Sequence, residues 1–217
     1  MASSLTHLGA ARRIMDRTRI EQPERFRLGQ ILPDCSAVPA QYTKRTHYRK
    51  VDPETGIRIF DLLSFRKEYG HLLEDDLYLG YYCHLIQDAV FRWFCFAHKR
   101  LQDLVPVWDH EATQKMYHDY SLQNRPLIDR YEIKVPEDLD LAGEPILTIA
   151  PMEVGKFLMG IREYYTTPAP EPPEPFLYSL QDTEEFLDIA CEACIKEIEA
   201  VKQGAPRLTG REWEYSH

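Results

Sequence analysis

Residues 80–94, GYYCHLIQDAVFRWF, leave the chain few ways to fold. Apolar side chains surround the axis of the helix that this stretch predicts, so the helix has no broad polar face. A helix of this kind belongs in the interior of a protein. Yet the stretch carries His84 and Asp88, and a buried charge without a partner is strongly unfavourable. The two groups must therefore either satisfy each other through a hydrogen bond or share a third partner.

The patterning elsewhere predicts further helices and little strand. Helices are expected over residues 5–19, 57–73, about 75–104, 110–131 and 151–165, with a last helix that Asp182 and Glu185 cap and Gly204 ends. Residues 44–56 are expected to form a polar loop, and PILTIA a short strand. The expected fold class is all-α, a compact multi-helix bundle. Residues 1–165 would form a helical core domain, with a Pro-rich connector and a C-terminal helix in residues 166–217 packing on it.

Composition excludes several classes of function. The chain has 217 residues and a net charge of −9, which argues against binding long nucleic acids or anionic lipid. No run of about 20 apolar residues predicts a membrane span, so no integral membrane association is expected. The N-terminal segment lacks the apolar core of a secretory signal. Five scattered cysteines do not suggest a disulfide framework. These features together predict a soluble, cytoplasmic protein.

Polar residues outside the helix change the interpretation of the His84–Asp88 pair. Residues four apart lie on one face of a helix, so this pair could bind one metal ion or two adjacent ions. His7 lies in the first helix, Asp34 ends the apolar run LGQILPD, and His47 lies in KRTHYR. Each is ordinary by itself. Together the five residues supply imidazole and carboxylate ligands, which zinc prefers, in a number sufficient for one or two ions.

The motifs THL, LGQILPD, TH and LGYYCHLIQD, in this order, resemble the zinc-dependent phospholipase C and single-strand nuclease superfamily, and most of all its small bacterial phospholipase C-like members. The resemblance covers roughly residues 5–130. It implies a helical bundle that holds zinc and hydrolyses phosphate esters. It also implies that His7, Asp34, His47, His84 and Asp88 are metal ligands, that Asp34 holds the attacking water, and that Asp88 bridges two ions.

The chain departs from this family pattern in two places. Secreted members use the amine of a processed N-terminal tryptophan as a ligand, and no tryptophan lies near the start of this chain. They also carry a histidine six residues after the helix aspartate, where this chain has Phe94, and a second His-x-x-x-Asp/Glu pair that has no counterpart here. We therefore expect one or two zinc ions rather than three.

The expected activity is a zinc-dependent phosphoesterase in which the metal activates a water molecule. Asp34 would orient that water or accept its proton. Arg45, Arg49 and Arg92 are candidates for contact with phosphate. A phospholipid head group, a nucleotide or another small phosphoester would suit the same chemistry.

Two other functions remain open. His118 and Asp119, with His84 upstream, loosely fit the residue order of HD-type metal phosphohydrolases. Alternatively, the helices form a non-catalytic interaction module with a degraded site. His98 and His110 are further candidates for a substitute metal ligand. The CEAC sequence (residues 191–194) is expected to serve packing, because it lies in a helical pattern with no second Cys pair.

Overall fold

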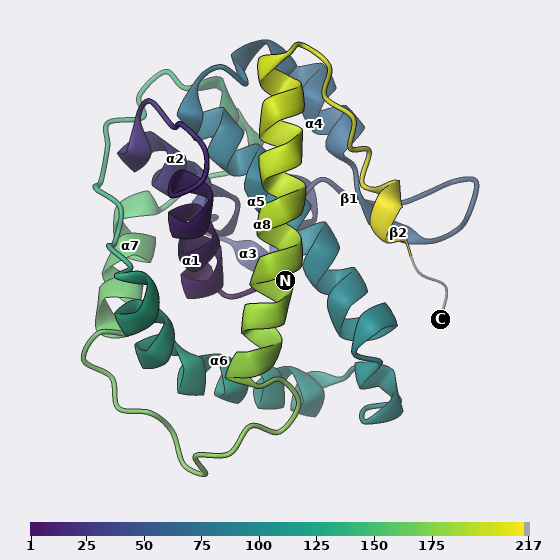
Figure 1. The fold of residues 1–217 in the computed structure, drawn as a ribbon, viewed down its shortest axis with the longest axis vertical. Helices are drawn as coiled ribbons and strands as arrows, with labels where there is room; N and C mark the ends of the chain where they lie inside the picture. Colours follow the sequence, from purple (N-terminus) through teal and green to yellow (C-terminus); the bar gives the residue numbers. More distant parts are fainter. Residues whose placement is uncertain (215–217) are drawn as a thin grey trace.

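The computed structural model describes residues 1–214 and is mostly helical, with one two-stranded antiparallel sheet (Figure 1). The helices are α1 (Ser4–Met15), α2 (Pro23–Gly29), α3 (Pro39–Thr46), α4 (Leu62–Tyr69), α5 (Asp76–Trp93), α6 (His110–Tyr131), α7 (Val154–Glu163) and α8 (Leu180–Lys202); the strands are β1 (Arg49–Val51) and β2 (Arg58–Phe60). The expectation of a mostly helical fold is confirmed. Within residues 1–214, the only strands are the three-residue strands of this hairpin.

The apolar helix α5 lies at the centre of the molecule. Its first 16 residues, Asp76 to Phe91, are all buried, as the pattern predicts for a helix without a polar face. α2 and α8 pack against it, and α8 also contacts α1 (Figure 1). The closest approach is between Gly29 and Gly80, whose Cα atoms face each other across α2 and α5. Gly80 thus makes room for a neighbouring helix.

Residues 44–56 are not the expected polar loop. They contain the end of α3, then β1, and then a tight turn that leads into β2. The Asp52 carboxylate accepts hydrogen bonds from the N–H groups of Glu54 and Thr55, and Gly56 adopts a φ of +70°. These are the features that close short turns. The first residues of the expected helix 57–73 consequently belong to β2, and the helix begins only at Leu62.

Two other boundaries also differ from expectation. α5 ends at Trp93 and passes into a π-helical turn, Phe94–His98, so it does not continue to residue 104. Arg100 then adopts a left-handed conformation, with a φ of 54°, which an α-helix cannot continue through. The expected strand in PILTIA is a 3-10 turn, Pro145–Ile149.

The last helix begins slightly earlier than the capping pattern indicated. The Ser179 side chain accepts from the N–H of Asp182, and the Asp182 carboxylate accepts from the N–H of Ser179. The capping box is therefore Ser179 with Asp182, in place of Asp182 with Glu185. No helix among residues 1–214 combines the length and apolarity needed to cross a bilayer.

Candidate metal centre

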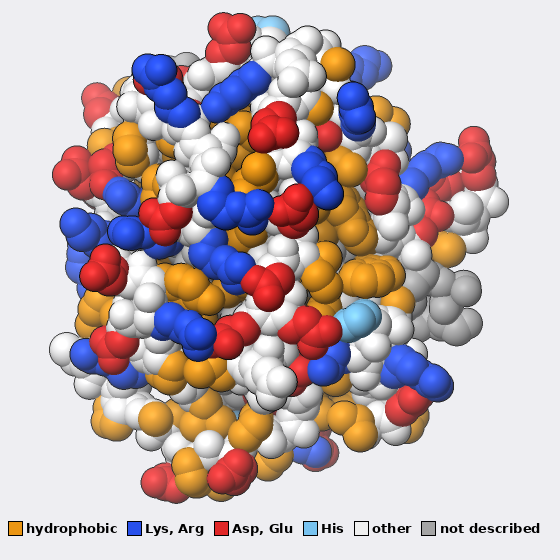
Figure 2. All heavy atoms as spheres, viewed as in Figure 1, with side chains coloured by type: hydrophobic (Ala, Val, Ile, Leu, Met, Phe, Trp, Pro, Cys, Tyr) orange, Lys and Arg blue, Asp and Glu red, His pale blue; other side chains and the backbone are white. Residues whose placement is uncertain are grey.

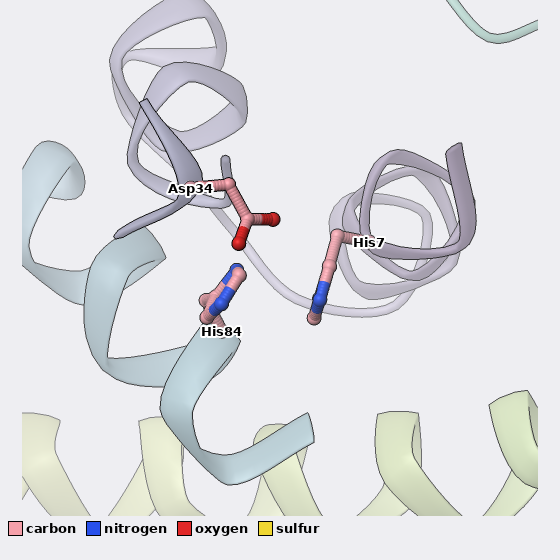
Figure 3. Close-up of side chains that lie close together, drawn as sticks. All are labelled: His7, Asp34 and His84. Carbon is pink, nitrogen blue, oxygen red and sulfur yellow. The ribbon is translucent and has the colours of Figure 1, made fainter. Parts of the chain in front are cut away.

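The structure brings all five candidate ligands together in the interior. His7 comes from α1, Asp34 ends the 3-10 turn Leu32–Asp34, His47 caps the C-terminus of α3, and α5 supplies His84 and Asp88. His7, Asp34 and His84 point toward a common space between their elements (Figure 3). We call these five residues the His/Asp cluster. The spacing along α5 predicted that His84 and Asp88 lie on one face of the helix. The positions of His7, Asp34 and His47 beside them depend on how α1, α2 and α3 pack.

Asp88 is the central residue of the His/Asp cluster. Its Oδ1 lies 3.5 Å from Nε2 of His7, and its Oδ2 lies 3.6 Å from Nε2 of His47 and 3.5 Å from Nε2 of His84. The N–H of Ala2 donates to Oδ1 over 3.0 Å. The Asp88 carboxylate is fully buried. Each oxygen of Asp88 therefore faces at least one imidazole nitrogen. In this position, each oxygen could share a metal ion with a histidine.

The Nδ1 atom of each ring faces an oxygen outside the cluster. Nδ1 of His84 donates to the carbonyl of Gln30 over 2.8 Å, and Nδ1 of His7 lies 2.6 Å from Oε1 of Gln87. Because these oxygens can only accept, His7 and His84 carry a proton on Nδ1, and Nε2 of the neutral ring directs a lone pair into the cluster, as in metal-bound histidines. Nδ1 of His47 lies 3.0 Å from the carbonyl of Thr43 and its Nε2 lies 3.2 Å from Oδ1 of Asp34, so both nitrogens of this ring face acceptors.

The distances inside the cluster fit shared coordination better than direct hydrogen bonds. The contacts of 3.5–3.6 Å between imidazole and Asp88 exceed hydrogen-bond length. Two ligands of a tetrahedral zinc ion stand about 3.3 Å apart, given metal–ligand distances near 2.0 Å. Nε2 of His7, Nε2 of His84 and Oδ2 of Asp88 are buried without a hydrogen-bond partner. Buried polar atoms of this kind are rare unless an ion or water satisfies them.

The ligand groups overlap at His84. His7, Asp34 and His84 offer atoms within 4.8 Å of one another, and so do His47, His84 and Asp88. Nδ1 of His84 is already committed to a carbonyl, so His84 can serve one ion through Nε2. The cluster therefore has a complete set of ligands for one ion. A second ion would depend on Asp88 as a bridge.

Burial and neighbouring charges shift the pKa values of the residues in the His/Asp cluster. Burial opposes ionisation of Asp88, but the close approach and charge of His7 and His84 outweigh it and hold the pKa of this carboxyl well below its usual range. The pKa of Asp34 is also lowered, since His47 offsets the effect of burial. Burial lowers the pKa of His84, while Asp88 raises that of His7 despite its burial. Two ionised carboxylates and a neutral His84 are the protonation states that zinc requires, whereas the raised pKa of His7 favours a protonated ring that would have to lose its proton on metal binding.

Asp34 connects the cluster to a cavity. Its side chain is 16% exposed, whereas those of the other four residues are at most 1% exposed. It lines a cavity of about 800 Å³ that Ala2, Arg49 and Tyr120 also line. The N–H of Ala37 donates to the carbonyl of Pro151, and the N–H of Glu153 donates to the carbonyl of Cys35. These two hydrogen bonds tie the loop after Asp34 to residues 151–153. A molecule in the cavity would thus meet the cluster at Asp34.

Three supporting groups escaped the sequence analysis. The backbone N–H of Ala2 binds Asp88, although no contribution from the N-terminal segment was expected. Gln87 accepts from His7 and donates to Oε1 of Gln30, which links two of the ring partners. Gln87 lies beside Asp88 in an apolar helix. A polar amide in such a helix is the sequence feature that could have identified Gln87 as a supporting residue.

The other candidate residues lie elsewhere. Oxygens of the Asp119 carboxylate accept from the N–H groups of residues 176–178, and Nε2 of His118 lies 2.8 Å from the carbonyl of Pro172. This pair therefore fastens the Pro-rich connector. His98 pairs with Glu185 at the surface, and His110 begins α6. Cys191 and Cys194 are buried free thiols inside α8, in keeping with a packing role.

Removal of metal is expected to destabilise the protein. A ligand held only by the folded state stabilises it by mass action, about 3 kcal/mol at 100 times its dissociation constant. For a chain of this size, chelation should lower the melting temperature by about 5–10 °C. Thermal unfolding with and without EDTA, followed by addition of zinc, measures the effect. A melting temperature that neither treatment changes would contradict a metal centre.

Comparisons with protein-family models, with curated proteins and with solved structures gave no match. The structure therefore describes the chain as a mostly helical protein in which three buried imidazoles and the buried Asp88 meet the partly exposed Asp34.

Proposed function

We propose that this protein is a zinc-dependent hydrolase of phosphate esters, with one or two ions held by the His/Asp cluster. The observation that carries the proposal is the pair His7 and His84, whose unpartnered Nε2 atoms each lie 3.5 Å from the Asp88 carboxylate while their Nδ1 atoms are held from outside. A plain structural cluster would close these gaps with hydrogen bonds. Zinc, when bound, lowers the pKa of a water molecule and polarises phosphoryl oxygens.

The residues around the cavity fit this chemistry. Asp34 lies where the cluster meets the cavity, so its carboxylate can orient a water molecule or accept its proton. Arg49 is half-buried, lines the same cavity and lies near enough to Asp88 for their charges to interact. A guanidinium in this position can bind an oxyanion of a substrate in the cavity. Arg92 also lines the cavity, whereas Arg45 does not.

The family resemblance supports the same function. The order of the five residues along the chain is that of the zinc-dependent phospholipase C and single-strand nuclease superfamily, and we propose membership of this superfamily and a bundle of its type. The HD-type alternative is less favoured, because His118 and Asp119 contact the connector rather than His84. A cytoplasmic location and small phosphoester substrates remain part of the proposal.

Activity on a chromogenic phosphodiester and monoester tests the proposal. Protein purified without chelator should contain one or two equivalents of zinc and hydrolyse at least one of these esters in a chelator-sensitive manner. His47→Ala and His84→Ala should lower kcat/KM by about 100-fold or more, since even loss of outer partners of metal ligands costs 10–100-fold. His118→Ala serves as the matched control and should stay near wild type. If His118→Ala is the inactive variant, the HD-type function is correct.

A non-catalytic protein with a degraded site would behave differently. It would bind metal weakly or not at all, and no phosphoester would be turned over. Elemental analysis beside the activity assay separates a structural metal site from an empty one.

A further inference from the structure

The lining of the cavity is rich in positive charge. Arg49, Arg58 and Arg92 all line the cavity, and Asp34 is its single acidic residue among those that the structure describes. The whole chain, by contrast, has a net charge of −9. On the face that carries α8, acidic and basic side chains are interspersed (Figure 2).

The hairpin supplies most of this charge. Arg49 lies in β1 and Arg58 in β2, which pair in an antiparallel register. Within residues 1–214, neither side chain forms an ion pair with a carboxylate. Arg49 and Arg58 lie close together in the lining of both hollows, so their like charges repel each other, and an anionic ligand between them would relieve the repulsion.

The charged surface continues beyond the cavity. A second hollow of about 470 Å³ shares Pro39, Thr43, Arg49 and Arg58 with the first, and Lys44 also lines it. Aromatic residues of the first cavity include Phe91, Trp108 and Tyr120. A ligand that extends from the cluster through the cavity therefore has both cations and aromatic rings among its neighbours.

We propose that Arg49 and Arg58 form a second anion-binding subsite, which selects phosphoesters carrying another negatively charged group beside the scissile phosphate. This inference rests on the proposed hydrolase function, because the cluster would hold the first phosphate. The phosphate at the cluster and the second anion on the hairpin would fix the orientation of the ester. The second group is an oxyanion, a phosphate or a carboxylate, since both form paired hydrogen bonds with guanidinium.

Three matched substrates test the proposed preference. They are p-nitrophenyl phosphodiesters whose other ester group is a propyl chain ending in a hydroxyl, a carboxylate or a phosphate. The zinc-loaded protein should cleave the charged esters with a kcat/KM about 10-fold or more above that of the neutral one, mainly through KM, as expected for loss or gain of one charged hydrogen bond. The order of the two charged esters identifies the preferred anion. Equal kcat/KM for all three would overturn the subsite.

Arg58→Gln and Arg45→Gln form the variant pair. Both remove one exposed cation, but only Arg58 lines the cavity. The ratio of kcat/KM for the charged esters to that for the neutral ester should fall toward one in Arg58→Gln and stay at its wild-type value in Arg45→Gln. A preference that survives in Arg58→Gln would also overturn the proposal.

A binding measurement separates this inference from catalysis. The fluorescent probe 8-anilinonaphthalene-1-sulfonate combines rings with one anion and needs no turnover. Its affinity for protein purified without chelator should fall several-fold in Arg58→Gln and not in Arg45→Gln. Arg58-dependent binding without hydrolysis of any ester would refute the hydrolase function and leave the subsite standing. Equal binding by both variants and the wild type would refute the subsite whatever the activity.

Discussion

Asp88→Asn is expected to remove most of the bound zinc and to lower phosphoesterase activity by at least about 100-fold. Asn keeps the size of the side chain, and its oxygen can still accept from the N–H of Ala2. The amide group, however, presents hydrogens to imidazole nitrogens that would otherwise bind metal, and it carries no charge to hold a cation. Elemental analysis of the purified variant and kcat/KM with added zinc measure the change.

The fold should survive this substitution. The amide can hydrogen-bond to Nε2 of an imidazole, so the metal-free variant should melt close to wild-type protein treated with chelator. Asp119→Asn is the matched control, because Asp119 is equally buried but accepts from three backbone N–H groups near the connector. It should cost about 1–3 kcal/mol of stability and keep its zinc. If Asp88→Asn retained wild-type zinc, the cluster would be a hydrogen-bonded core feature.

Gly80→Ala is expected to have the largest effect on stability. A Cβ at this position would lie 2.3 Å from the carbonyl oxygen of Phe26 and 3.1 Å from Cα of Gly29. The obstacle is the backbone of α2, so α2 and α5 would have to separate. Overpacking of this kind costs about 3 kcal/mol, a large fraction of the stability of a typical domain. Urea denaturation followed by circular dichroism gives the free energy of unfolding.

Gly160→Ala supplies the control for Gly80→Ala. Gly160 also lies within a helix, α7, but no atom lies within 4 Å of where its Cβ would be. This variant should be unchanged or more stable by up to about 1 kcal/mol, from helix propensity alone. Because His84 lies one turn beyond Gly80, the Gly80→Ala variant should also bind zinc more weakly. Equal stability of Gly80→Ala and wild type would show that α2 and α5 do not approach each other this closely.

Several features could be predicted from local pattern. The apolar helix, its burial and the shared face of His84 and Asp88 follow from residue spacing and from the cost of exposing so many large side chains. The helix expected at residues 110–131 agrees with α6; Pro126 predicts a break or kink in it, and α6 continues through this residue. His7, Asp34 and His47 are each ordinary alone; they are candidates because, together with His84 and Asp88, they supply the ligand types that zinc prefers, and because they match the motifs of the family.

The hairpin and α2 were not predicted from the sequence. β1 and β2 contain three residues each, too short for a periodicity to stand out, and the polar turn between them masked the pairing. α2 is seven residues long, and its place depends on Gly29 meeting Gly80. Short elements gain most of their stability from packing, so their own sequences carry a weak signal.

Sequence alone determined which chemical groups this protein buries: an apolar helix must go inside, and His84 and Asp88 must go with it. The tertiary structure decided what those groups meet. Residues separated by up to 81 positions converge because α1, α2 and α3 pack around α5, and the outer partners Gln30, Thr43 and Gln87 turn each ring toward Asp88. Ring orientation depends on hydrogen bonds to groups distant along the chain, and no local pattern specifies it.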